Sequence, residues 1–317
     1  RPTSLGFLAA MNGVRWVDSR TLLEDFGFGR AIAAISEALE SGYDPDTDHS
    51  RSVISFAEGQ GLVMPSEYMD RVGLKFVTVA PKNPAIGLDR IQGIYTLFDA
   101  QTLSPILQCD GATLTLLRTA SVTAAIVKRL LSIQNPSVAV FGSGPQASAH
   151  IKALSASTGV GKISLFARNP ESSQQLVADL TAQGFDISIG SEEDLLGADL
   201  VLTLTTSREP LFDERQLSPT AVIAAIGSHE ATARELPGEL MGSAVVYIES
   251  LKSALSEAGD VIMAIEEGHV EQADLVKIRQ LFSSTGNHES SGRKVFKSTG
   301  MSWQDLVVVR ALEKSLA

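Results

Sequence analysis

The residues best suited to chemistry form a short glycine-rich loop, Gly-Ser-Gly-Pro-Gln-Ala at positions 142–147. The loop directly follows the apolar run at 138–141, so we expect a strand, a tight turn and then a helix. The first glycine permits the turn, the second lets a pyrophosphate approach the backbone, and the alanine keeps the helix close to the strand. The proline suits a first helical turn, whose free amides can hold a phosphate. The loop therefore predicts dinucleotide binding through Gly142, Ser143, Gly144, Gln146 and Ala147.

The choice between NAD and NADP depends on the turn after the second strand, where NAD enzymes usually carry an acid for the ribose 2′-hydroxyl. Here that turn reads Ala167-Arg168-Asn169-Pro170 and has no carboxylate. A guanidinium can bind a 2′-phosphate with two parallel hydrogen bonds. Arg168 and Asn169 therefore favour NADPH as the cofactor. The alternative is that Arg168 is a solvated turn residue.

The loop requires a parallel sheet to position it, and the sequence from 138 onward predicts one. Short apolar runs alternate there with longer segments of helical periodicity, which is typical of βαβ units. We expect helices at 146–157 and 171–183, and strands at 138–141, 163–166, 200–203, 222–226 and 245–248. This half of the chain is predicted to be a doubly wound Rossmann domain, so the fold class is α/β.

The first 117 residues lack a regular helix between their apolar runs, so we expect a separate, mostly antiparallel α+β domain. Its predicted strands lie at 53–56, 74–79, 91–98 and near 103–107. Residues 303–316 predict an amphipathic helix, with Glu313 and Lys314 outward, that packs back on this domain. The predicted domains are 1–118 with 298–317, and 119–297. The polar, Ser- and Gly-rich stretch 283–294 is expected to be a surface loop.

The composition of the chain limits which classes of binding partner are expected. The 317 residues carry a net charge of -11 with no basic run, so nucleic acid is not an expected partner. The single cysteine, Cys109, fits a reducing cytoplasm, and no apolar run approaches the roughly 20 residues that span a bilayer. The histidines show no metal-ligand spacing, and no hydrolase elbow is present, so neither a metal nor serine hydrolysis is expected. Because the sequence starts at Arg1, an N-terminal targeting segment remains an open alternative.

Several motifs in order along the chain carry a family resemblance. They are Arg-Ser-Val at 51–53, Gly-Leu-Lys at 73–75, residues 114–120, the glycine loop, Ser-Glu-Ala-Gly-Asp at 256–260 and residues 295–300. Together they resemble the ornithine cyclodeaminase and mu-crystallin family, and the last two resemble its mu-crystallin branch in particular.

The resemblance implies that Arg51, Lys75 and Arg118 converge on the carboxylate of an imino- or amino-acid substrate. A guanidinium pair and an ammonium would orient the α-carbon toward the nicotinamide. The first domain would then bind substrate and form a homodimer, its strands pairing across the two-fold axis. Further cofactor contacts are expected at Thr119, Thr205, Ser298 and Gly300.

One position departs from the deaminating members of that family, which carry a catalytic aspartate where this sequence has His229. Its absence indicates a reductase. Either His229 or Glu257 is the candidate proton donor, and Lys75 and Arg118 complete the predicted catalytic set. For His229 the alternative is a loop residue that only shapes the pocket, and for Glu257 it is helix capping or solvation.

Three functions are therefore compared. The first is NADPH-dependent reduction of a C=N bond in a carboxylate-bearing imine or cyclic ketimine, or the reverse amino-acid dehydrogenation. The second is an ornithine cyclodeaminase-type lyase that uses bound NAD(P) without net redox. The third is a non-catalytic protein of the crystallin type that binds NADPH or another small ligand.

Overall fold

The chain forms two compact units in a computed structural model that describes residues 13–283 and 292–316. The described part of the first unit comprises 13–34, 47–118 and 301–316, and that of the second comprises 35–46, 119–283 and 292–300. The helices α2 (Gly27–Glu40) and α3 (Gly111–Leu130) belong partly to each unit. The predicted domain bounds share the division at 118/119 and differ at 35–46 and 298–300.

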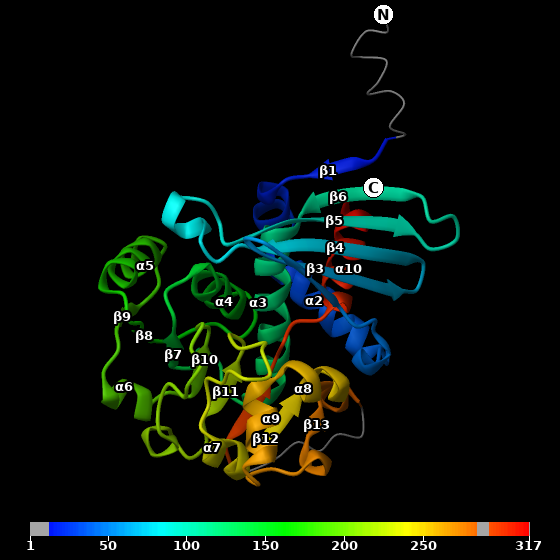
Figure 1. Ribbon diagram of the computed structural model, residues 1–317. Coiled ribbons are helices and arrows are strands. Elements are labelled where there is room, and N and C mark those ends of the chain that lie inside the picture. The colour runs from blue at the N-terminus through cyan, green and yellow to red at the C-terminus, as the bar shows by residue number, and fades with distance from the viewer. Residues whose placement is uncertain (1–12, 284–291, 317) are drawn as a thin grey trace, which may run out of the picture. The chain divides into compact units, whose positions relative to one another are not determined.

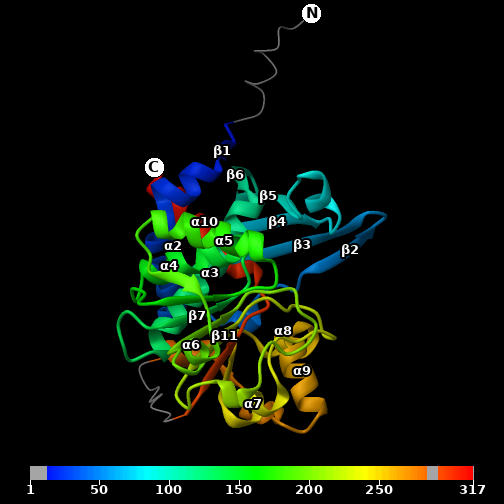
Figure 2. The same ribbon diagram turned by 90° about the vertical axis from the view of Figure 1, so that its left-hand side faces the viewer.

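The first unit is built on a six-stranded sheet with the strand order β1-β6-β5-β4-β3-β2, in which β2 forms one edge (Figure 2). Strands β2 to β6 pair antiparallel in sequence, and β1 joins β6 in parallel. Their bounds are β1 Arg15–Val17, β2 Ser52–Phe56, β3 Gly59–Tyr68, β4 Arg71–Val79, β5 Ile91–Asp99 and β6 Pro105–Asp110. The sequence did not predict β3, because Gly59, Gly61 and Pro65 interrupt its pattern.

The two faces of this sheet differ in polarity and cover. Helix α10 (Ser302–Ser315) packs against β3, β4 and β5 (Figure 1). The covered face carries buried side chains such as Met64 and Val77. On the other face Phe76 pairs with Ile94, and Ile94 is 46% exposed. The alternation of side chains along a strand therefore leaves apolar groups on the uncovered face.

The prediction for the C-terminal helix is only partly right. Its last turns place Lys314 in solvent as expected, but residues 302–309 are all buried, including Gln304 and Asp305. These two polar side chains bind other buried groups, which is why polar residues occur on a helix that is enclosed on all sides.

The second unit contains an eight-stranded, fully parallel sheet with the order β13-β12-β14-β11-β10-β7-β8-β9, which confirms the doubly wound prediction. Its strands are β7 Val138–Phe141, β8 Ile163–Phe166, β9 Ile187–Ile189, β10 Leu200–Thr203, β11 Val222–Ala225, β12 Val245–Ile248, β13 Val276–Lys277 and β14 Lys294–Lys297. Its helices are α4 Pro145–Ser155, α5 Pro170–Ala182, α6 Glu192–Leu196, α7 Gly238–Ser243, α8 Leu251–Glu257 and α9 Gly259–Glu266. The predicted surface loop at 283–294 lies mostly outside the described residues, and its last residue, Lys294, is the first residue of strand β14.

Short helical turns complete both units. They are the π-helical turn η1 Thr21–Phe26 and the 3-10 turns η2 Pro45–Thr47, η3 Asn83–Ile86, η4 Glu214–Gln216, η5 Gln272–Asp274 and η6 Ile278–Phe282.

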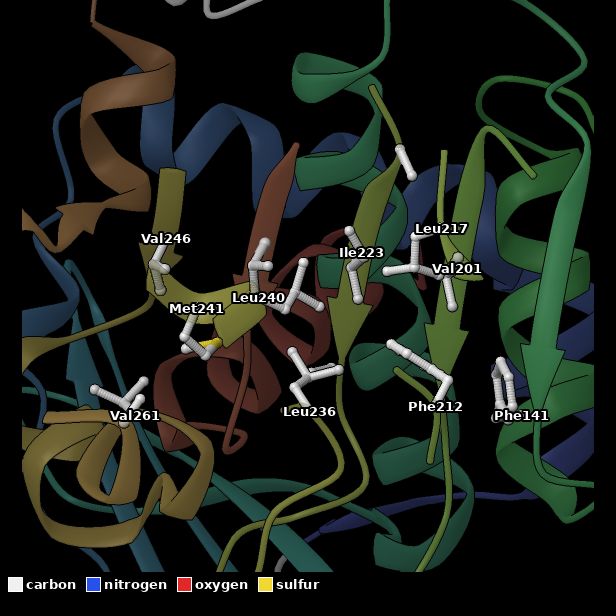
Figure 3. Close-up of a cluster of buried hydrophobic side chains, with 14 of the residues drawn as sticks. Phe141, Val201, Phe212, Leu217, Ile223, Leu236, Leu240, Met241, Val246 and Val261 are labelled. Carbon is white, nitrogen blue, oxygen red and sulfur yellow. The ribbon is translucent and has the colours of Figure 1, made fainter. Parts of the chain in front are cut away.

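One face of the parallel sheet forms a hydrophobic core with the segments that follow β11 and β12. Val201, Ile223 and Val246 project to the same side from three strands (Figure 3). Met241 of α7 and Val261 of α9 pack against them. All five side chains are at most 1% exposed, so this core holds the sheet rigid beneath the loops at its carboxyl edge.

Candidate active site

The first unit buries a cluster of charged side chains on three elements. Lys75 of β4 lies with its Nζ 2.7 Å from Asp305 Oδ2, and Arg118 of α3 lies with its Nε 3.3 Å from Asp305 Oδ1. Lys75 is 1% exposed, Arg118 5% and Asp305 0%. Charges this deeply buried are retained only when they are paired, so the cluster is a built feature of the unit.

Hydrogen bonds to further side chains fix the orientation of the cluster and of the helix that carries Asp305. Gln304 Oε1 accepts a 2.6 Å hydrogen bond from Arg118 Nη1, and Lys75 Nζ donates to Thr115 Oγ1 at 3.2 Å. Asp48 Oδ2 accepts the Trp303 backbone N–H at 2.8 Å, which satisfies a free donor in the first turn of α10. The helix that supplies Gln304 and Asp305 is therefore held at its start.

The electrostatics of this cluster favour an anion. Burial, helped by the neighbouring Arg118 and Arg51, lowers the pKa of Lys75 to about 8, while Asp305 acts in the opposite direction. One carboxylate thus lies among three cationic side chains. A substrate carboxylate would restore the balance, because an opposite charge nearby favours the ammonium form.

The structure therefore brings together the three predicted substrate-binding residues, Arg51, Lys75 and Arg118, closely enough that both guanidinium groups act on the Lys75 ammonium. Asp305, Gln304 and Thr115 were not predicted. Gln304 and Asp305 form a polar pair inside the apolar pattern of the last helix, which is the signal that could have found them, whereas Thr115 lies in α3.

In the second unit the glycine loop has the geometry that its sequence predicts. Gly142 follows β7 with a φ of 112°, and a Cβ there would lie 2.7 Å from the Leu204 carbonyl oxygen, so only glycine fits. Helix α4 begins at Pro145. A Cβ on Gly144 would meet no atom within 4 Å, so space is open at the amino end of the helix, where a pyrophosphate would bind.

Two polar atoms support the presence of a ligand at the second unit. Gln146 Oε1 and Thr119 Oγ1 are buried and have no hydrogen-bond partner in the part of the chain that the structure describes. A buried polar atom without a partner is costly unless a ligand or water satisfies it. Both residues were predicted cofactor contacts, so the residues present fit a dinucleotide.

The turn that carries Arg168 lies beside the glycine loop. Gly142 N–H donates to the Phe166 carbonyl at 2.8 Å, and the hydroxyls of Ser143 and Ser172 are 2.7 Å apart. Asn169 caps α5 by accepting from Ser172 N–H, and Arg168 is exposed. The predicted Arg168 and Asn169 are thus adjacent to Ser143, although the Asn169 side chain serves the helix.

Other predicted cofactor residues are held by buried carboxylates that the sequence analysis missed. Glu235 accepts from the Thr205 hydroxyl at 2.7 Å and from Thr203, and Glu249 accepts from the Ser298 hydroxyl and from the Gly300 N–H. These contacts tie down the carboxyl ends of β10, β12 and β14. In the sequence Glu235 is marked only by its place at the end of a loop, and Glu249 only by its place directly after strand β12.

The two candidate proton donors lie on different segments of the second unit. His229 is exposed on the loop after β11, with its Nδ1 3.4 Å from the Gly227 carbonyl oxygen. Glu257 is half-buried at the end of α8, where its Oε2 accepts from the Ser253 hydroxyl at 3.5 Å.

Within the described residues, no three His, Cys, Asp or Glu side chains are grouped so that they would hold a metal ion. None of the helices in this part of the chain is both long enough and apolar enough to cross a bilayer.

The sequence model of the ornithine cyclodeaminase/mu-crystallin family matches residues 17–317. The chain belongs to this family. It is 31% identical over 273 residues to a Delta(1)-pyrroline-2-carboxylate reductase of Bacillus cereus, covering 83% of this chain and 84% of that protein. It is 30% identical over 272 residues to the ketimine reductase mu-crystallin of Mus musculus, covering 84% of each. The resemblance predicted from the motifs is thereby confirmed.

A solved structure agrees with the fold of this family member. The Thermococcus litoralis Delta(1)-pyrroline-2-carboxylate reductase, in complex with NADH and L-proline, superposes with a TM-score of 0.87 at 22% identity. The alignment covers 96% of this chain and 98% of that one.

Proposed function

We propose that the protein is an NADPH-dependent reductase of the C=N bond in a cyclic imine that bears a carboxylate, or catalyses the reverse dehydrogenation of the cyclic amino acid. The observation that carries the proposal is the buried cluster of Lys75, Arg118 and Asp305, in which the cations outnumber the carboxylate. The names of the two relatives support this substrate class, because one is a reductase of pyrroline-2-carboxylate and the other a ketimine reductase.

The residues of the first unit would bind the substrate. Arg118 and Lys75 hold its carboxylate by charge-assisted hydrogen bonds, and Arg51 adds a second guanidinium. This fixes the position of the adjacent imine carbon before any bond changes, which lowers the entropic part of the barrier.

The chemistry of reduction divides between the cofactor and the protein. Bound NADPH supplies a hydride for the imine carbon. A protonated imine nitrogen makes that carbon electrophilic, and we assign the proton to His229 or Glu257. To identify the donor, each residue is replaced by Gln and kcat is measured over a range of pH. The ionisation of the true donor produces one limb of the pH profile of kcat, so only its replacement removes that limb.

We assign NADPH as the preferred cofactor. Arg168 is exposed beside the glycine loop, no carboxylate occupies its turn, and a guanidinium there can bind a 2′-phosphate. Replacing Arg168 by Ala should weaken NADPH binding by about tenfold or more and leave NADH binding nearly unchanged. Equal losses for both cofactors would contradict the assignment.

The proposal extends to a homodimer formed through the uncovered face of the six-stranded sheet. Ile54 and Phe56 of β2 and Ile94 of β5 are 43%, 51% and 46% exposed on it. Apolar groups gathered on one face of a sheet mark an association surface. A second copy of the chain is the occupant that the family resemblance implies.

The decisive experiment follows NADPH oxidation with five- and six-membered cyclic imines that carry a 2-carboxylate. Turnover is expected for the purified protein, and Arg118→Ala should raise KM by about a hundredfold, since a charged hydrogen bond to the substrate is lost. Arg20→Ala, at an exposed pair with Glu24, is the matched control and should behave as the unchanged protein.

Two other results would replace the proposal. Release of ammonia from ornithine without NADPH consumption would establish the cyclodeaminase-type lyase. NADPH binding without turnover of any imino acid would establish a non-catalytic binding protein.

A further inference from the structure

Among the described residues of the first unit, Asp305 is the one carboxylate that touches both Lys75 and Arg118. Its Oδ1 lies 2.9 Å from Lys75 Nζ and 3.3 Å from Arg118 Nε, and its Oδ2 lies 2.7 Å from Lys75 Nζ. The two cations come from β4 and α3, so no local backbone geometry holds them together. The carboxylate therefore determines where the ammonium and the guanidinium lie relative to each other.

The surroundings give Asp305 no freedom to move. It occupies the first turn of an enclosed helix that Asp48 anchors at Trp303, and the next residue, Leu306, packs on Gly73. A Cβ on Gly73 would lie 1.8 Å from the Tyr95 hydroxyl oxygen and 3.2 Å from Leu306 Cδ1, so glycine is required at this contact. The Gly-Leu-Lys motif at 73–75 thus serves the same cluster twice, through the space at Gly73 and the charge at Lys75.

We propose that Asp305 is a positioning residue that aligns Lys75 and Arg118 for the substrate carboxylate and keeps the Lys75 amine protonated. The inference rests on the proposed function, because it assigns a role toward the same substrate.

Among the charged and titratable groups around Asp305, Lys75 is the one that titrates at mildly alkaline pH. Burial next to Asp305 raises the pKa of Tyr95 and of Cys109, so neither ionises there. The pKa of Asp48 is about 6 because of burial, and Arg118 and Arg51 are the two guanidinium groups that act on Lys75. The pKa of Lys75 is about 8, and the ion pair with Asp305 is what opposes a further fall.

The test compares Asp305→Asn with the unchanged protein in steady-state imine reduction over a range of pH. The variant should raise KM at neutral pH by about tenfold or more, with a smaller change in kcat, because the amine that binds the carboxylate loses its proton and its alignment. The alkaline limb of kcat/KM should move down by about one pH unit. A merely structural role for Asp305 would lower the amount of active enzyme and leave KM and the limb in place.

A second variant keeps the inference testable if Asp305→Asn does not fold. Asp305→Glu retains the charge and moves the carboxylate by one methylene, so the alkaline limb should stay while KM rises. Asp70→Asn is the matched control, since Asp70 pairs with Arg310 of the same helix at an exposed site and should change neither quantity.

Each outcome is distinguishable. A protein that does not reduce any cyclic imine overturns the proposed function, and this inference with it. An active protein whose Asp305→Asn form keeps the KM and the alkaline limb overturns the role of Asp305 alone, as does an Asp305→Glu form with unchanged KM.

Discussion

The ammonium of Lys297 lies 2.9 Å from Asp260 Oδ2, and both side chains are excluded from solvent. Lys297 also donates to the Ser228 carbonyl oxygen at 2.7 Å, while Asp260 Oδ1 accepts the backbone N–H groups of Glu235 and Leu236. One ion pair therefore connects the end of β14 and the start of α9 to both ends of the loop that carries His229. The position of this candidate proton donor depends on a contact remote from it in sequence.

Replacing Lys297 by Met should destabilise the second unit by about 3 kcal/mol, because it leaves the Asp260 carboxylate buried without its counter-ion. The exposed pair of Lys82 and Glu58 is the control, and Lys82→Met should change stability by less than about 1 kcal/mol. Urea unfolding followed by circular dichroism measures both. Similar losses of unfolding free energy in the two variants would show that the buried ion pair stabilises the protein no more than the exposed one.

The two glycines of the cofactor loop should separate folding from binding. Ala at position 142 must adopt a left-handed φ and press on the Leu204 carbonyl, so Gly142→Ala should lower the melting temperature. Ala at position 144 meets empty space, so Gly144→Ala should fold normally and yet bind NADPH about tenfold or more weakly, because its methyl group occupies the pyrophosphate position. Calorimetric titration and thermal melting separate the two effects. Unchanged NADPH affinity in Gly144→Ala would place the pyrophosphate elsewhere.

Much of the second unit is predictable because its signals are local. An apolar strand leads into the glycine turn at 142–147, and a helix follows the turn. Each of these three elements is specified by its own residues. Predicted strands such as 138–141 and 163–166 coincide with β7 and β8. Strand β14 was not predicted, and neither was its place in the sheet between β11 and β12, both of which precede it in sequence. Sheet order is set by tertiary pairing, which no local pattern reports.

The charged site is predictable only in part, for a related reason. Lys75 and Arg118 were identified through family motifs, and the structure brings them together on Asp305. Nothing in the spacing of 75, 118 and 305 indicates that these residues meet. The last helix was expected to be amphipathic with Glu313 and Lys314 outward, and that pattern gave no role to Gln304 and Asp305, which the structure buries.

The oligomeric state offers a test of the uncovered sheet face. Ile54→Asp should convert the proposed homodimer to a monomer, because a carboxylate would be buried without a partner in the interface. Analytical ultracentrifugation measures the result. Ile189→Asp, at a position 57% exposed on β9 of the second unit, is the control and should leave the dimer intact. A dimer that survives the change at Ile54 would exclude this face.

Acid should destabilise the second unit through His150. Burial lowers its pKa to about 4 from 6.5, and its ring contacts the Gln146 carbonyl oxygen and the Thr123 hydroxyl. Between these two values the unfolded chain binds more protons than the folded one, so stability is complete above about pH 6.5 and falls as the pH drops toward 4. The shift corresponds to about 3 kcal/mol.

The measurement compares unfolding of the unchanged protein and of His150→Asn from pH 4 to pH 7. Asp48 contributes the opposite slope, since burial raises its pKa from 3.8 to about 6 and its stabilising effect is lost as the pH rises through that value. This contribution is the same in both proteins and cancels in the difference between their curves. The difference should therefore grow as the pH rises from 4 to 6.5, and a constant difference would show that His150 titrates normally in the folded chain.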